Sequence, residues 1–125
     1  NMCYDSENNF IALSALRKVV HALKDRYAVT VVFDPGITQQ LRANRDDIAK
    51  NLGRGVSTYI APQGDTADSY ILHLADNKPD TYVISNDIYT DYPDHECVKS
   101  KRIFGSLIAN GQAIVRGLDI NEAYQ

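Results

Sequence analysis

Cysteine is scarce in this chain, with only Cys3 and Cys97 among 125 residues. Two cysteines are too few for a disulfide scaffold, and neither belongs to a C-x-x-C pair of the kind that binds zinc or carries out redox chemistry. The sequence therefore favours a reduced, cytoplasmic setting.

Long hydrophobic runs are absent as well. The most apolar stretch, residues 27–33, is much shorter than the roughly 20 residues that a membrane helix needs. No signal-peptide pattern precedes it. We expect a soluble chain with no membrane partner. Because Asn1 precedes Met2, the protein could have further domains outside this chain. A homodimer is a separate open alternative.

Positive charge is not in excess either, because 13 Lys and Arg residues face 16 Asp and Glu residues, a net charge of −3. This balance disfavours a protein that coats nucleic acid through bulk positive charge, although a local basic patch is compatible with it. The proportions of hydrophobic residues (44%) and charged residues (23%) are ordinary for a globular protein. The length suits a single domain over residues 1–125.

Two hydrophobic periodicities alternate along the chain. Apolar residues spaced by three and four predict helices, and short β-branched runs predict strands. The expected helices cover residues 10–27, 37–52, a segment capped by Asp65 or Thr66 with its inner face at Ala67, Tyr70, Ile71 and Leu74, and residues 98–109. The expected strands are residues 2–4, 27–33, 56–61, 81–85 and 112–115. Such alternation predicts an α/β fold with a parallel sheet of about five strands, covered by helices on both faces.

Acidic residues gather where the expected strands end, which is the edge at which open α/β sheets bind ligands. They are Asp5, Asp34, Asp87 and Asp91, together with Asp65 and Asp68 at the start of the third expected helix. Carboxylates that converge on one crevice repel each other and need a cation. Mg²⁺ or Mn²⁺, which take oxygen ligands, would supply it and would also hold a phosphate substrate.

Each acidic group also has a purely structural interpretation. Asp65 and Asp68 would suit a helix cap and a first-turn acid, which taken alone is the commoner role of such a pair. Asn86 and Asp87 would suit a turn, and residues 5–8 would suit a cap for the first helix. The metal-site prediction therefore depends on these groups meeting at one edge of the sheet.

Several segments resemble one known family. Residues 82–91 (Y-V-I-S-N-D-I-Y-T-D) are similar to the hydrophobic-V-S-N-D-x-Y-x-D signature of the NYN ribonucleases in the PIN-like superfamily, above all of their Regnase-type domains. Residues 67–75 resemble the family's D-D-x-x-I-x-x-L-A helix, and residues 5–8 (D-S-E-N) stand where the family has D-G-S-N. Residues 101–103 are similar to the basic start of the family's next helix. The resemblance covers nearly the whole chain in order.

This resemblance implies a PIN-like, Rossmann-like three-layer sandwich with strand order 3-2-1-4-5 and a Mg²⁺- or Mn²⁺-dependent ribonuclease that leaves a 5′-phosphate. Endonucleolytic cleavage of single-stranded or loop RNA is expected, because an unpaired RNA backbone can enter an acidic crevice. The implied metal ligands are Asp5, Asp68, Asp87 and Asp91, with Asn8 orienting water or phosphate beside them. The candidate substrate contacts are Ser85, Asn86, Arg54, Lys101 and Arg102.

Departures from the family pattern support two rival hypotheses. Ser6 replaces the family's glycine, Ala67 replaces the first Asp of its D-D pair, and residues 62–65 carry no Lys or Arg. A catalytically inactive PIN-like domain that binds RNA or assembles a complex would fit these changes. The second rival is a haloacid-dehalogenase-like phosphatase with Asp34 as nucleophile, since D-P-G-I-T resembles D-x-D-x-T, although Gly36 stands in place of the second Asp. In the PIN-like strand order, Asp34 is instead expected to be a turn residue.

Overall fold

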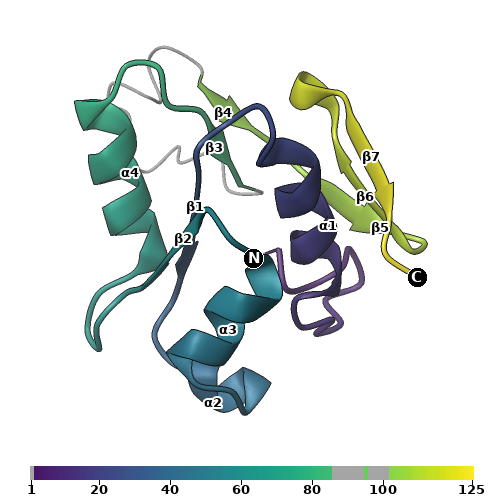
Figure 1. Ribbon diagram of the computed structural model, residues 1–125, viewed down its shortest axis with the longest axis horizontal. Coiled ribbons are helices and arrows are strands. Elements are labelled where there is room, and N and C mark those ends of the chain that lie inside the picture. The colour runs from purple at the N-terminus through teal and green to yellow at the C-terminus, as the bar shows by residue number, and fades with distance from the viewer. Residues whose placement is uncertain (1, 86–94, 96–101) are drawn as a thin grey trace.

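A computed structural model describes residues 2–85, 95 and 102–125 (Figure 1). Its helices are α1 (Ser14–Leu23), α2 (Ile37–Leu41), α3 (Arg45–Leu52) and α4 (Ala67–Asn77), with a 3₁₀ turn at Arg116–Leu118. Its strands are β1 (Val29–Phe33), β2 (Val56–Ile60), β3 (Val83–Ile84), β4 (Ile103–Phe104), β5 (Leu107–Ala109), β6 (Gln112–Val115) and β7 (Ile120–Ala123). Helices and strands mostly alternate from α1 to β3, and four strands and the 3₁₀ turn make up most of the described residues 102–125.

The strands form three small sheets, so the prediction of one parallel sheet of about five strands is wrong. β1 pairs with β2 in parallel, from Val29 opposite Val56 to Phe33 opposite Ile60. β3 pairs with β4 in parallel over two residues each. β5, β6 and β7 form an antiparallel sheet. The protein is therefore a small α/β protein with two parallel pairs and one antiparallel sheet among its described residues.

The expected first strand, residues 2–4, makes a single bridge between Tyr4 and Phe10. The chain folds back here because Asn8 and Ala12 take the left-handed φ angles of 63° and 55°. The Cys3 carbonyl accepts the Ile11 N–H at 2.8 Å. Residues 2–4 therefore use backbone groups for hydrogen bonds within the N-terminal loop, and they do not become a strand of the sheet.

The helix expected over residues 98–109 is also wrong for the part that the structure describes, where β4 and β5 occupy residues 103–104 and 107–109. Asn110 and Gly111 link β5 to β6 with φ angles of 53° and 75°. Two positive φ angles in a two-residue Asn-Gly loop are typical of the type I′ turn of a hairpin. The hairpin signal therefore prevails over the helical spacing of the apolar residues that precede it.

Two other predicted helices differ in extent. Residues 10–27 give the shorter helix α1, which buries Leu16, Val20 and Leu23 as predicted, whereas Phe10 and Tyr27 are each 40% exposed and lie outside it. Residues 37–52 give α2 and α3, because Arg42 ends α2 with a φ of 52°. Gly53 ends α3 with a φ of 104°, a conformation that suits glycine, so this predicted helix end is confirmed.

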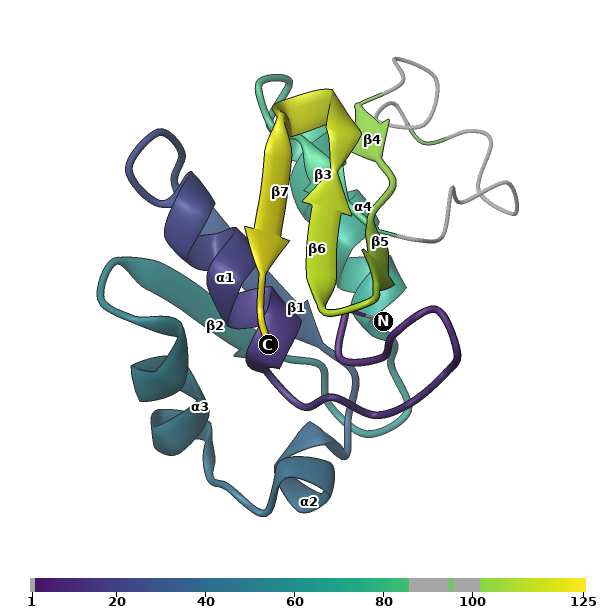
Figure 2. The same cartoon turned by 90° about the vertical axis from the view of Figure 1, so that its right-hand side faces the viewer.

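The core lies around α1, which sits between the β1–β2 pair and the antiparallel sheet (Figure 2). Its buried residues include Val19, Val20, Val31, Phe33, Ile48, Val115 and Ile120. On the other side of the β1–β2 pair, α4 packs Leu72 and Ala75 against Val83 of β3 in a second, smaller cluster. This second cluster packs α4, which carries Asp68, against β3, which directly precedes Ser85.

The start of α4 follows the prediction. Thr66 is the N-cap residue, and its side-chain oxygen accepts the Ser69 N–H at 3.3 Å. The predicted inner face is only partly correct, because Ala67 is buried but Tyr70, Ile71 and Leu74 are half-buried. The Tyr70 ring stacks on Tyr59 of β2 with 3.8 Å between ring centroids.

Candidate functional site

The predicted site residues fall into three groups. Asp5 and Asn8 lie in the N-terminal loop, Asp68 lies in the first turn of α4, and Ser85 directly follows β3. Arg54 and Arg102 precede β2 and β4. The remaining predicted residues lie outside the described part of the chain: Asn86, Asp87, Asp91 and Lys101.

The Asp5 carboxylate is held by its own loop. Its Oδ1 accepts the backbone N–H groups of Glu7 and Asn9, each at 2.9 Å, and its Oδ2 accepts the Asn9 side-chain amide at 3.2 Å. These bonds, above all the one from the Asn9 backbone, hold the pKa of Asp5 below its ordinary value. The carboxylate is therefore ionised at neutral pH, and Oδ2 keeps acceptor capacity for a cation.

Asn8 shapes the same loop. Its backbone N–H donates to the Asp5 carbonyl at 3.0 Å, and its φ of 63° is one that asparagine adopts more readily than most residues. Its side chain is exposed. The alternative in which residues 5–8 cap the first helix is wrong, because α1 begins at Ser14 with Leu13 at the N-cap position.

Asp68 lies at the start of α4, and Ser85 lies just after β3. Asp68 is the first-turn acid of α4 and is half-buried. Ser85 is only 3% exposed, and its backbone N–H donates to the Phe104 carbonyl at 3.0 Å. The chain therefore enters the acidic part of the signature, residues 86–91, from a buried and hydrogen-bonded position.

The structure gives Asp34 a role that sequence reasoning missed. Its Oδ1 accepts the backbone N–H of Ala67 at 2.8 Å, which ties the end of β1 to the first residue of α4. This N–H is one of the donors at a helix start that lack a partner within the helix. The two residues are 33 positions apart, so no local pattern reveals the bond. The phosphatase hypothesis for Asp34 stays untested.

Arg102 makes bonds within the protein that the sequence did not indicate. Its side chain is 9% exposed, and Nη1 lies 2.9–3.1 Å from the carbonyl oxygens of Ala75, Lys78, Pro79 and Thr81. A buried guanidinium at the last carbonyls of a helix satisfies them and suits the negative end of the helix dipole. Arg102 therefore fastens the end of α4 to the turn that leads into β3.

Arg54 and Arg102, two of the predicted substrate contacts, lie apart from the predicted acidic edge. Arg54 is exposed between Gly53 and Gly55, before the first residue of β2, whereas the acidic edge follows the last residues of the strands. Arg102 binds the C-terminal end of α4, and Asp68 lies at its N-terminal end. Since α4 has 11 residues and a helix rises 1.5 Å per residue, its two ends are about 16 Å apart.

The donor set suits a hard cation, because carboxylate oxygens are the ligands that Mg²⁺ and Mn²⁺ prefer. Within residues 2–85, 95 and 102–125, no three His, Cys, Asp or Glu side chains come together as a metal site. Only Asp5 and Asp68 of the four predicted ligands belong to those ranges, so the four-residue site stays a prediction. Asp5 suits such a cation, because its carboxylate is ionised and Oδ2 keeps acceptor capacity beside the Asn9 amide.

A pair that the sequence did not predict lies beside α4. His95 Nδ1 makes a hydrogen bond to Asp76 Oδ2, and both side chains are half-buried. Asp76 belongs to the last part of α4, so this pair is at the opposite end of the helix from Asp68.

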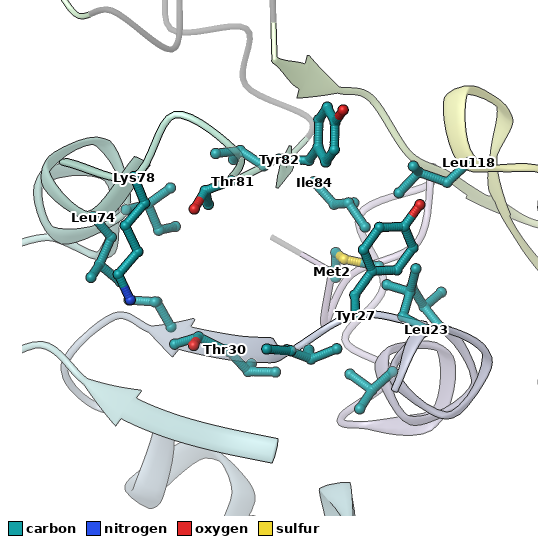
Figure 3. Close-up of a pocket in the computed structure, with 18 of the residues that line it drawn as sticks. Met2, Leu23, Tyr27, Thr30, Leu74, Lys78, Thr81, Tyr82, Ile84 and Leu118 are labelled. Atoms are coloured by element: carbon teal, nitrogen blue, oxygen red, sulfur yellow. The ribbon is translucent and has the colours of Figure 1, made fainter. Parts of the chain in front are cut away.

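The structure also contains a cavity whose lining includes none of the predicted site residues. It encloses about 730 Å³ between β1 and β3, and its lining also includes residues of α1, α4 and the N-terminal segment (Figure 3). Cys3 is one lining residue, and burial raises the pKa of its thiol. The sequence did not indicate a cavity here, because the expected strand over residues 2–4 would have filled the space between β1 and β3.

Comparison with protein families, with curated proteins and with solved structures finds no match for this chain. Across the residues placed in the structure, no helix combines the length and the apolar character needed to cross a membrane. The ribonuclease hypothesis therefore stays a prediction from the sequence motifs.

Proposed function

We propose that this chain is a ribonuclease domain that hydrolyses RNA phosphodiester bonds with the help of Mg²⁺ or Mn²⁺. The observation that supports this best is the Asp5 loop, which holds an ionised carboxylate by three hydrogen bonds and leaves an acceptor position on Oδ2. Asp5 is the first of the four residues that the family resemblance implies as metal ligands. The scarcity of cysteine supports a cytoplasmic site of action.

The predicted site residues would have three roles: to hold the cation, to orient water or phosphate, and to position the acidic segment. Asp5, Asp68, Asp87 and Asp91 would hold the cation. When bound, it lowers the pKa of a water ligand and stabilises charge on the scissile phosphate. Asn8, exposed in the Asp5 loop, would orient water or phosphate, and the buried backbone of Ser85 fixes the point from which residues 86–91 depart.

Single-stranded or loop RNA is the proposed substrate, and endonucleolytic cleavage the proposed reaction. A duplex holds its backbone in a fixed helix, whereas an unpaired strand can bend into an acidic crevice. Because Arg54 and Arg102 lie apart from the predicted acidic edge, Lys101 is the remaining cation among the predicted substrate contacts, and it would bind the phosphate beside the metal ion.

An assay with labelled single-stranded and hairpin RNA tests this function. Wild-type protein should cleave in Mn²⁺ and stop in EDTA, and Asp87→Asn and Asp5→Asn should lose cleavage. Asparagine at position 5 keeps an oxygen that can accept the Glu7 and Asn9 N–H groups, so the loop should survive the loss of charge. Asp25→Asn, at an exposed position just after α1, is the matched control and should cleave normally. Cleavage that persists in EDTA would contradict the proposal.

A second candidate is a catalytically inactive domain that binds RNA, and one observation favours it. Ala67, which replaces the first Asp of the family's D-D pair, is 8% exposed, and its N–H is held by Asp34. A buried, helix-starting alanine provides no ligand at this position. RNA binding without cleavage in the same assay, in Mg²⁺ as well as Mn²⁺, would select this candidate.

A further inference from the structure

The cavity between β1 and β3 is bounded by two strand edges. Figure 3 shows Thr30 on one wall and Tyr82 and Ile84 on the opposite wall. Leu74 of α4 closes one side, and Leu23 of α1 closes the other. A volume of about 730 Å³ falls within the usual range of ligand-binding pockets, about 300–1,000 Å³.

The edge of β1 that faces the cavity carries backbone groups without a strand partner in the described chain. The Phe33 carbonyl accepts the Ala61 N–H at 2.9 Å, so the backbone of Phe33 points toward β2. Successive residues of a strand present their N–H and C=O groups to alternate sides, so Val31 also points toward β2. Thr30 and Val32 consequently point to the other side, and both line the cavity.

The same geometry holds for β3. The Val83 N–H donates to the Arg102 carbonyl at 2.9 Å, and the Ser85 N–H donates to the Phe104 carbonyl, so these two residues point toward β4. Tyr82 and Ile84, which alternate with them, point away from β4, and both line the cavity. Two strand edges with available donors and acceptors therefore face one another across it.

We propose that this cavity is a binding slot for an extended, apolar peptide segment of another polypeptide chain, which pairs with β1 and β3 at the same time. We call the cavity the strand slot. The backbone of a peptide strand carries partial positive charge on its N–H groups and partial negative charge on its C=O groups, in alternation on both sides. It therefore complements the charges on both edges, as added strands do at exposed sheet edges.

The side chains around the slot define the partner's chemistry. Leu16, Val20 and Leu23 of α1 lie on one side, and Ile71 and Leu74 of α4 lie on the other. Both faces of the bound strand would therefore contact apolar groups, which is the environment of the continuous Val- and Ile-rich strands in parallel sheets. A segment as long as β1, five residues, spans about 17 Å.

Part of the lining of the slot is polar, because Asn77, Lys78 and Asp80 belong to it. Polar residues flanking the apolar segment suit this part of the lining. A second copy of this chain is a less suitable donor, since each named strand of the described residues is already paired in its own sheet and would have to leave it. A separate apolar segment requires no such exchange.

The test uses wild-type protein and a fluorescein-labelled peptide, Lys-Val-Val-Ile-Val-Val-Lys, with blocked ends. Fluorescence anisotropy should show saturable binding. Two further peptides carry N-methyl groups on alternate residues, one set for each side of the strand. Each should bind about tenfold more weakly or worse, because each lacks the donors for one edge. Asp87→Asn protein should bind the peptide as the wild type does, which separates this proposal from the ribonuclease.

A pair of protein variants locates the binding. Leu74→Arg places a charge in the slot and should abolish peptide binding, whereas Leu107→Arg, at a 47% exposed position on β5 outside the lining, should not. The N-methyl peptides keep the test decisive if Leu74→Arg does not fold, because they use the wild-type protein. No saturable binding up to about 1 mM peptide would overturn the proposal. Equal affinity for methylated and unmodified peptides would also overturn it, and so would self-association that the peptide competes with.

Discussion

Replacing Arg102 with alanine should destabilise the protein strongly, because its guanidinium holds four backbone carbonyls at the end of α4. A buried hydrogen bond from a charged group contributes about 1.5–3 kcal/mol, and favourable interaction with the helix dipole adds about 0.3–1 kcal/mol. Because one nitrogen carries these bonds, their energies do not add in full. We expect a loss of about 3 kcal/mol in the free energy of unfolding, a large share of the roughly 5–15 kcal/mol typical of a domain.

Thermal unfolding followed by circular dichroism measures this loss. For a domain of this size, each kcal/mol lowers Tm by about 3–5 °C, so Arg102→Ala should melt about 10–15 °C below wild type. Arg54→Ala, at an exposed position, is the matched control, and its free energy of unfolding should stay within about 0.5 kcal/mol of the wild-type value. Arg102→Lys should lie between the two, since a lysine ammonium keeps the charge and loses the fork of donors. An Arg102→Ala protein that melts with wild type, and binds RNA less tightly, would refute the structural role and favour the phosphate contact.

Three further predictions concern Asp5, Asp34 and the binding of metal. In EDTA, Asp5→Ala should be less stable than wild type at neutral pH. The difference in stability should disappear as the pH falls below 3.8, the ordinary pKa of an aspartate, because a carboxylate with a lowered pKa gives stability that protonation removes. Melting curves from pH 7 to pH 2 check this. Asp34→Ala should cost about 1 kcal/mol by leaving the Ala67 N–H without its acceptor, with Asp25→Ala as control; urea unfolding measures the difference. Mn²⁺ at 100 times its dissociation constant should stabilise wild type by about 2.7 kcal/mol and Asp87→Asn by less, and equal melting shifts would contradict Asp87 as a ligand.

The sequence predicted those elements whose formation is decided by residues close to one another in the chain. The β-branched run at residues 29–33 forms β1, Thr66 caps α4 through its own side chain, and Gly53 ends α3 with a positive φ. Each of these outcomes is decided by residues within a few positions of one another. The wrong helix over residues 98–109 had a local signal against it, the Asn110–Gly111 pair, whose backbone suits a hairpin turn.

Contacts between distant segments were not predictable in this way. The Asp34–Ala67 and Arg102–Ala75 bonds join residues 33 and 27 positions apart. The PIN-like strand order predicts Asp34 as a turn residue, and the family resemblance predicts Arg102 as a substrate contact, and neither prediction indicates the partner that each side chain has in the structure. The residue types of the candidate site are consequently a prediction from the sequence, while the structure assigns the supporting roles of Asp34 and Arg102.

The failure of residues 2–4 to form a strand and the presence of the strand slot have one physical cause. Once this segment folds back toward Phe10, β1 and β3 keep their facing edges, and Ile71 and Leu74 of α4 stay half-buried although their spacing suits a core. The sequence of β1, V-T-V-V-F, is β-branched along nearly its whole length, which is typical of strands covered on both faces within a sheet. Strands of that kind usually have a neighbour on each side, whereas β1 pairs only with β2 among the described strands. The residues of β1 and the unfilled face of α4 therefore argue independently for a second strand beside β1, which is what the strand slot would receive.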